Sequence, residues 1–170
     1  MGAQEHKADA PDRVGCMVVT VSDTRTEETD KSGQLMKQLL EEAGHVTCLY
    51  RIVKDEPDEV IAAIEAGIAH PDVQVILLNG GTGISPRDNT YEAVKGLLEK
   101  ELPGFGELFR MLSYSEDIGS AAMLSRAIAG TRKGKMIFST PGSTGAVRLA
   151  MNRLIVPELG HVVRELNKKT

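Results

Sequence analysis

The sequence predicts an α/β fold, a three-layer sandwich in which a mostly parallel central sheet carries helices on both faces. Three observations indicate this architecture. Apolar runs rich in β-branched residues alternate along the chain with segments whose apolar residues recur at helical spacing. Two of the apolar runs end in glycine-rich turns. The chain has 170 residues, of which 41% are hydrophobic, so it can bury a sizeable core, and one domain is expected.

The first part of the chain predicts a polar tail, a strand and a helix. Residues 1–13 are polar, and we expect them to be disordered, with the domain occupying residues 14–170. Residues 15–21 are an apolar, Val-rich run and predict a buried strand. After a polar loop, residues 31–43 predict a helix because Leu and Met recur there at helical spacing. Gly44 suits the position after the C-cap of that helix.

The next part predicts a second strand, a second helix and a third strand. Residues 46–53 place their side chains alternately on two faces and predict a strand. Asp55 is expected to cap the following helix, and Pro57 is expected in the first turn of that helix. The helix is expected to end near His70. Residues 73–79 are a continuous apolar run and predict a strand that is buried on both faces.

Helices dominate the middle of the sequence. Thr90 is expected to cap a helix, which the Pro and Gly of residues 102–106 interrupt. Residues 105–112 predict a helix with a strongly apolar face, and residues 120–128 predict another helix, which ends at Gly130.

A turn, a strand and a helix complete the chain. Residues 132–135 predict a turn, and residues 135–140 predict the fourth strand. Residues 141–145 form a second glycine-rich loop, and residues 147–166 predict a long helix. Strands and helices therefore alternate throughout, as they do in parallel sheets with helical crossovers.

The turn after the third strand is the strongest candidate for a ligand site. Its residues are Gly80, Gly81, Thr82 and Gly83. It could be a simple tight connection, but glycines also let several backbone N–H groups point at one anion, a phosphate above all. Arg87 could neutralise such a phosphate, and Asp88 could hold a metal ion beside it. Neither the P-loop pattern nor the dinucleotide-binding pattern is present.

Two further loops follow strands of the predicted sheet. The second glycine-rich loop contains Pro141, Gly142 and Ser143, with Pro141 where a nucleophile elbow needs Gly, so serine hydrolysis is disfavoured. We expect Ser143 to cap the last helix and to offer its hydroxyl and N–H to an anion. Ser22 and Arg25 lie in the loop after the first strand. This loop could be an ordinary capped turn, or its arginine could bind a phosphate through two hydrogen bonds.

Acidic residues follow two of the predicted strands. Asp55 and Asp88 could each be a helix cap or a solvated loop residue. As a pair they suit Mg²⁺, which in proteins takes one or two carboxylates plus substrate phosphates. Ligands of such sheets bind beyond the carboxyl ends of the strands. We therefore expect four separate segments to converge on one crevice there.

Composition narrows the class of protein. The net charge of −4 argues against non-specific binding to nucleic acid. No segment approaches the roughly 18 apolar residues of a membrane span. The polar start of the chain lacks the apolar stretch of a signal peptide, so a soluble, cytoplasmic protein is expected.

Four motifs occur together, in order, over roughly residues 14–166. They are VTVSDTR at residues 19–25, NGGTGISPRDNT at residues 79–90, LPGFGE at residues 102–107 and TPGS at residues 140–143. In this combination the chain resembles the molybdenum cofactor biosynthesis family of MoaB and MogA proteins.

The resemblance implies a ligand and a reaction. The ligand is molybdopterin, and in MogA-like members ATP and molybdopterin give adenylylated molybdopterin and pyrophosphate with Mg²⁺. Asp55 and Asp88 match the acids implied to act on metal and nucleotide. The glycine turn and Ser143 would cradle phosphate or pterin, with Ser22 and Arg25 on the same crevice. The alternative is a protein of the same pathway that binds molybdopterin or a precursor without chemistry.

The resemblance also implies an assembly and partners. Members form homotrimers or homohexamers and work with other proteins of the molybdenum cofactor pathway. The apolar helix around residues 105–112 could supply the interface between copies.

Overall fold

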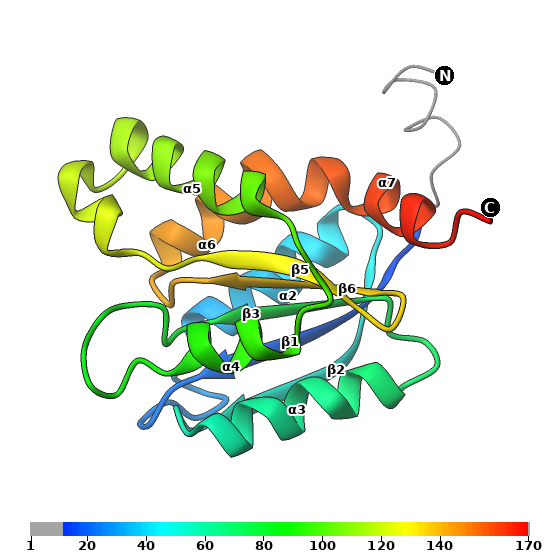
Figure 1. Ribbon diagram of the computed structural model, residues 1–170, viewed down its shortest axis with the longest axis horizontal. Coiled ribbons are helices and arrows are strands. Elements are labelled where there is room, and N and C mark those ends of the chain that lie inside the picture. The colour runs from blue at the N-terminus through cyan, green and yellow to red at the C-terminus, as the bar shows by residue number, and fades with distance from the viewer. Residues whose placement is uncertain (1–11, 170) are drawn as a thin grey trace.

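The computed structural model describes residues 12–169 and confirms the α/β class (Figure 1). Its six-stranded sheet has the order β2-β1-β3-β6-β5-β4. The strands are β1 (Gly15–Val21), β2 (Val46–Val53), β3 (Val75–Asn79), β4 (Lys100–Glu101), β5 (Ile128–Arg132) and β6 (Lys135–Thr140). β1 pairs in parallel with β2 and β3, and β3 pairs in parallel with β6, while β5 and β4 are antiparallel at one edge. Most of the expected disordered tail lies outside the described residues.

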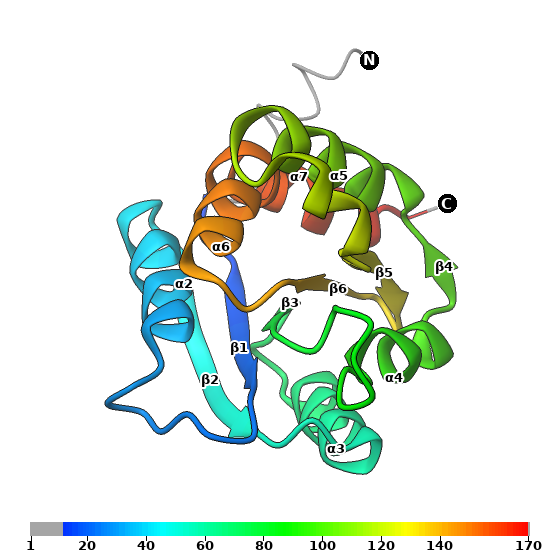
Figure 2. The same ribbon diagram turned by 90° about the vertical axis from the view of Figure 1, so that its left-hand side faces the viewer.

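Helices cover both faces of the sheet, as predicted (Figures 1 and 2). One face carries α2, α5, α6 and α7, and the other carries α3 and α4. Their bounds are α2 (Lys31–Glu42), α3 (Pro57–Ala69), α4 (Thr90–Leu97), α5 (Pro103–Glu116), α6 (Thr144–Ala150) and α7 (Val156–Leu166). A 3₁₀-helix, η1 (Gly119–Leu124), follows α5, and a π-helical turn, η2 (Met151–Ile155), joins α6 to α7. None of the helices within residues 12–169 has the length and apolar character needed to cross a membrane.

The central strand β1 is buried on both faces. Its alternate residues Cys16 and Val18 belong to the core beneath α2, α5, α6 and α7. Met17 and Val19 belong to the second core, beneath α3 and α4. All four side chains have no exposed surface. This double burial explains why the strand is a continuous apolar run rather than an alternating one.

The helix expected over residues 120–128 is wrong at its carboxyl half. The 3₁₀-helix ends at Leu124, and Ile128 begins β5, which pairs antiparallel with β6. A two-residue hairpin turn joins these strands, with Lys133 and Gly134 at φ of +47° and +77°. The turn expected at residues 132–135 is thus confirmed. A short run of small apolar residues suits a helix or a strand equally, and here pairing with β6 decides the outcome.

Two of the expected helix caps are also wrong. The N-cap of α3 is Glu56 and that of α4 is Asn89, and neither side chain caps its helix. Asp55 instead accepts a hydrogen bond from the backbone N–H of Asn89, 3.1 Å away. Thr90 is the first residue of α4 rather than its cap. Both side chains are therefore directed toward the glycine turn instead of their own helices.

A histidine at the amino end of the sheet makes stability depend on pH. Nδ1 of His45 accepts a hydrogen bond from the backbone N–H of Val14 at 3.0 Å. Burial lowers the pKa of His45 below its ordinary value of 6.5. The folded protein therefore favours the neutral ring, while the unfolded chain takes up a proton at higher pH.

We expect the free energy of unfolding to fall as the pH drops below about 6.5 and to level off below the folded pKa of His45. His45→Gln should remove this part of the pH dependence. Urea unfolding of both proteins from about pH 8 to about pH 5 measures it. Parallel pH profiles for the two proteins would contradict the assignment.

Candidate active site

The carboxyl ends of β1, β3 and β6 form one rim of the sheet. Their parallel pairing is in register, so Thr20, Asn79 and Thr140 lie beside one another near the strand ends. The backbone N–H of Gly80 continues this pairing, donating to the carbonyl of Thr140 at 2.9 Å. The loops that follow the three strands leave the sheet at this edge, which faces the viewer in Figure 2. The loops after β1, β3 and β6 thus lie at one edge of the sheet, three of the four segments expected to converge there.

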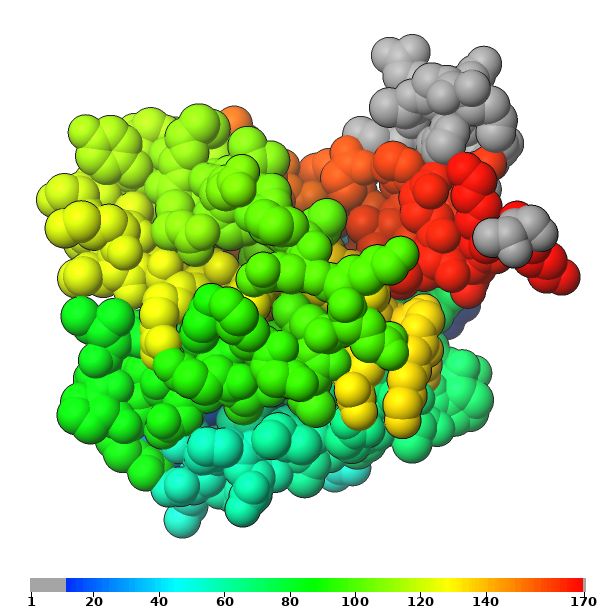
Figure 3. All heavy atoms as spheres, viewed as in Figure 1, coloured from blue at the N-terminus to red at the C-terminus, as the bar shows by residue number. Residues whose placement is uncertain are grey.

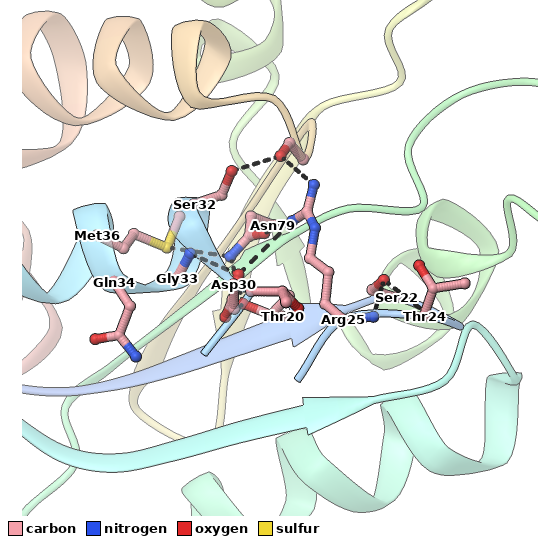
Figure 4. A network of polar contacts seen from close by, with 12 residues as sticks. Thr20, Ser22, Thr24, Arg25, Asp30, Ser32, Gly33, Gln34, Met36 and Asn79 are labelled. Carbon is pink, nitrogen blue, oxygen red and sulfur yellow. Dashed lines mark hydrogen bonds and ion pairs between the residues drawn. The ribbon is translucent and has the colours of Figure 1, made fainter. Parts of the chain in front are cut away.

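Arg25, in the loop after β1, contacts the end of β3 and the loop after β6 (Figure 4). Its Nη2 donates to the carbonyl of Gly142 at 2.9 Å, and its Nη1 donates to Oδ1 of Asn79 at 3.4 Å. The hydroxyl of Ser32 donates to the same Gly142 carbonyl at 2.6 Å. The guanidinium that the sequence suggested as a phosphate clamp thus braces the rim. The hydroxyl oxygen of Ser22 accepts a hydrogen bond from the backbone N–H of Arg25 at 3.1 Å, which is the ordinary turn considered above.

A buried carboxylate supports this brace. Asp30 has no exposed surface, and it accepts hydrogen bonds from the hydroxyl of Thr20 at 2.6 Å, from the N–H of Gly33 at 2.9 Å and from the hydroxyl of Tyr50. Its Oδ1 lies 3.7 Å from Nη1 of Arg25. Burial, reinforced by the Asp30 carboxylate, raises the pKa of Tyr50, so the phenol stays protonated and donates. Sequence analysis did not identify Asp30, although its place before a helix is a recognisable cap position.

The glycine turn has the conformation that its sequence predicts. Gly80 and Gly81 have φ of +105° and +71°. A Cβ atom at Gly80 would lie 2.2 Å from the carbonyl oxygen of Val21. A Cβ atom at Gly81 would lie 2.0 Å from Oγ1 of Thr90 and 2.5 Å from Oδ2 of Asp55. Only glycine fits at either position, because both the backbone angle and the space forbid a side chain.

Backbone N–H groups of both glycine-rich loops are unpaired. Within residues 12–169, the N–H groups of Gly81, Thr82 and Gly83 have no hydrogen-bond acceptor, and neither do those of Gly142 and Ser143. The hydroxyl of Ser143 accepts the N–H of Ala146 at 3.1 Å, so its predicted role as a helix cap is confirmed. Unpaired amides at a turn and at a helix start are the usual protein ligands of phosphate.

Arg126 anchors the far end of the glycine turn. Its backbone N–H donates to the carbonyl of Thr82 at 2.9 Å, and its Nε donates to the carbonyl of Gly83 at 3.0 Å. Nη2 donates to the carbonyl of Asp88 at 3.0 Å, and the guanidinium pairs with Glu92. Sequence analysis missed Arg126 because it lies in the segment expected to be helical, and only the fold brings it to the turn.

Arg87 and Asp88, in the loop that continues from the turn, are held by different partners. Oδ2 of Asp88 accepts the N–H and the hydroxyl of Ser85, at 2.9 and 2.7 Å. Arg87 makes a two-pronged contact with Asp23 at 2.9 and 3.0 Å and an ion pair with Glu56 at 2.6 Å. Arg87 lowers the pKa of Asp23. The arginine expected to neutralise phosphate is thus engaged with two acids.

Asp55 is buried at the rim, with 6% of its surface exposed. Burial raises its pKa, and the charges of Asp88 and Asp23 raise it further. Asp55 and Asp88 flank the same glycine turn, since Cβ atoms at Gly81 and Gly83 would lie 2.5 Å from Oδ2 of Asp55 and 2.7 Å from Oδ2 of Asp88. Within residues 12–169, no three His, Cys, Asp or Glu residues group as a metal site. A cation here would need hydroxyl, backbone, phosphate or water oxygens as well, which is the coordination typical of Mg²⁺.

The fold and the rim place this chain in the class of α/β proteins with an open, mostly parallel sheet, whose members bind ligands at the carboxyl ends of the strands. A family model described as a probable molybdopterin binding domain matches residues 17–161. Molybdenum cofactor biosynthesis protein B of Bacillus anthracis is 62% identical over 169 residues, which cover 99% of this chain and 100% of that protein. The chain belongs to this molybdenum cofactor biosynthesis family, so the resemblance drawn from the motifs is confirmed.

Solved structures agree with the family. A crystal structure of a molybdenum cofactor biosynthesis protein B has 63% identity and a TM-score of 0.92, covering 95% of this chain and 100% of that one. The tungsten cofactor synthesizing protein MoaB from Pyrococcus furiosus has 38% identity and a TM-score of 0.83, covering 94% of this chain and 100% of that one.

The buried carboxylate of Asp30 should carry much of the stability of the rim. Asp30→Ala leaves buried donors and the Arg25 guanidinium without their partner, so we expect a loss of about 3–5 kcal/mol in the free energy of unfolding. Glu41→Ala, at an exposed position of α2, the helix that follows Asp30, should change the free energy of unfolding by less than about 0.5 kcal/mol. Urea unfolding measures both. Equal small effects would show that the network is not stabilising.

Proposed function

We propose that this protein acts in molybdenum cofactor biosynthesis, where it binds molybdopterin and adenylylates it with ATP and Mg²⁺, releasing pyrophosphate. The observation that carries the proposal is the meeting of two loops with unpaired amides and two carboxylates on one rim. Amides suit phosphoryl oxygens, and carboxylates suit the cation that accompanies them. Family membership supports the choice of molybdopterin as the ligand.

The two glycine-rich loops would bind different phosphoryl groups. The amides of Gly81, Thr82 and Gly83 lie next to the acids, so they suit the polyphosphate of ATP. The amides of Gly142 and Ser143 lie at the start of α6, where the helix dipole also favours an anion, and they suit the terminal phosphate of molybdopterin. A Cβ atom at Gly142 would lie 3.2 Å from the Cα atom of Gly80, so the two loops are adjacent.

The acids would hold Mg²⁺, which neutralises pyrophosphate as it leaves. Asp55 fits this role because it is buried, carries a raised pKa and has one carboxylate oxygen without a hydrogen bond within the described chain. Asp88 lies on the adjacent loop and would exchange its contact with Ser85 for the nucleotide complex. Because the net charge is −4, the positive charge for a polyanionic substrate has to come from a local basic cluster or from such a cation.

The chemistry needs no covalent intermediate with the protein. A terminal phosphate oxygen of molybdopterin forms a bond to the α-phosphorus of ATP, and the bond from that phosphorus to the pyrophosphate oxygen breaks. The side chains and amides of the rim align the two substrates and stabilise charge, which is the main source of catalysis in such transfers. Arg25 and Arg126 would keep the loops in place during the reaction.

We also propose a cytoplasmic homotrimer or homohexamer that works with other proteins of the cofactor pathway. Leu108, Met111 and Tyr114 on α5 are 48%, 55% and 64% exposed, which is unusual for large apolar side chains. Figure 3 shows the side chains of α5 and the following 3₁₀-helix along the upper left of one face. A second copy would cover them, and sedimentation velocity measures the resulting mass.

Pyrophosphate release tests the adenylylation. Wild-type protein with molybdopterin, ATP and Mg²⁺ should release pyrophosphate, and Asp88→Asn should lower the rate by about a hundredfold or more. Molybdopterin affinity, measured by calorimetry, should change far less, because Asp88 acts on the nucleotide side. Asp58→Asn, at an exposed acid of α3, is the matched control and should leave both values unchanged.

Two results would count against this proposal. Tight molybdopterin binding by the wild type without pyrophosphate release would support the non-catalytic binding protein instead. An equal loss of rate and affinity in Asp88→Asn would place that residue in pterin binding rather than in catalysis.

A further inference from the structure

Thr90 has a buried hydroxyl without a partner. The residue has no exposed surface, and its Oγ1 has no hydrogen-bond partner within residues 12–169. A hydroxyl that leaves water without a new partner destabilises the folded state, whereas a methyl group of the same shape does not. The hydroxyl therefore has no structural benefit to offset its cost.

The unpaired hydroxyl and an unpaired carboxylate oxygen lie beside the same glycine. Oγ1 of Thr90 and Oδ2 of Asp55 flank the same α-carbon, that of Gly81, where a Cβ atom would lie 2.0 and 2.5 Å from them. Oδ1 of Asp55 accepts the N–H of Asn89, while Oδ2 has no hydrogen bond within the described chain. Both oxygens therefore lie on the same side of Gly81, and any side chain at residue 81 would clash with them.

No cationic side chain of the described residues pairs with Oδ2. Arg87 is the basic residue of this loop, and its guanidinium is bound to Asp23 and Glu56. Another acid lies beside Asp55, since Oδ1 of Asp23 accepts the backbone N–H of Asp55 at 3.1 Å. A carboxylate oxygen beside an unpaired hydroxyl, with negative charge around it, is suited to a hard cation with oxygen ligands.

We propose that Thr90 and Asp55 together hold the divalent cation of the proposed reaction, with the Thr90 hydroxyl as a second protein oxygen ligand. The inference rests on the proposed function and adds to it a ligand outside the acidic pair. Serine and threonine hydroxyls are established Mg²⁺ ligands at phosphate-binding loops, so the donor set is chemically consistent. Because Gly81 has no side chain, none blocks the approach to the two oxygens.

Mn²⁺ binding followed by electron paramagnetic resonance tests the proposal without relying on turnover. Mn²⁺ is titrated alone and as Mn²⁺–ATP into wild type, Thr90→Val and Thr90→Ser. Thr90→Val keeps the shape and removes the oxygen, so binding should weaken at least about tenfold. Thr90→Ser keeps the oxygen and should bind as the wild type does.

Thr47→Val is the matched control. Oγ1 of Thr47 is also buried and unpaired, but the residue lies near the start of β2, at the opposite end of the strand from Asp55. The same substitution there should leave Mn²⁺ binding unchanged. Without metal, both valine variants should unfold at the wild-type temperature or above it, because each removes a buried unpaired hydroxyl. Only Thr90→Val should lose the rise in melting temperature that Mn²⁺ causes.

The outcomes separate the two proposals. Thr90→Val could bind Mn²⁺ as tightly as the wild type while Asp55→Asn binds it more weakly. That result would overturn the role of Thr90 but would leave the proposed cation site at Asp55. A similar loss in Thr47→Val would also overturn it, because the effect would then not depend on the site. If the wild type binds neither Mn²⁺ nor Mn²⁺–ATP, the cation site of the proposed function fails as well.

Discussion

The parallel, in-register pairing of β1, β3 and β6 is the constraint on which the candidate site depends. It places three loops at one rim, although they are separated by more than a hundred residues from Arg25 to Gly142. Parallel strands require this arrangement, because each carboxyl end must point the same way. Once the loops are adjacent, a single arginine can bridge all three, and a buried carboxylate, Asp30, can hold that arginine.

Glycine makes the close approach at this rim possible, and hydrogen bonds then fix it. Gly80 and Gly81 bring the backbone against β1 and against Asp55, where a side chain could not fit. Arg126 binds the carbonyls of Thr82 and Gly83 within the turn, while the N–H groups of these two residues have no acceptor within residues 12–169. The site is thus built mainly from main chain, with charged side chains serving as supports.

The carboxylates of the rim would favour the binding of a cation over the binding of a free anion. Three acids, Asp23, Asp55 and Asp88, flank the loops of the rim, and of these Arg87 forms an ion pair with Asp23, the most exposed. Burial already raises the pKa of Asp55, so a divalent ion would relieve an unfavourable interaction as it binds. Such a site would take up nucleotide with its metal more readily than free nucleotide, which is consistent with a transferase that uses Mg²⁺–ATP.

The sequence by itself determined the α/β class, the main strands, the two glycine-rich loops and the family, because periodicity, glycine spacing and motif order are local properties. Only the tertiary structure decided that Asp55 and Thr90 turn toward Gly81 instead of capping their helices. It also decided that residues 128–132 form a strand and that Arg126 reaches the glycine turn. These outcomes depend on partners distant along the chain, and short-range propensity cannot distinguish them from their alternatives.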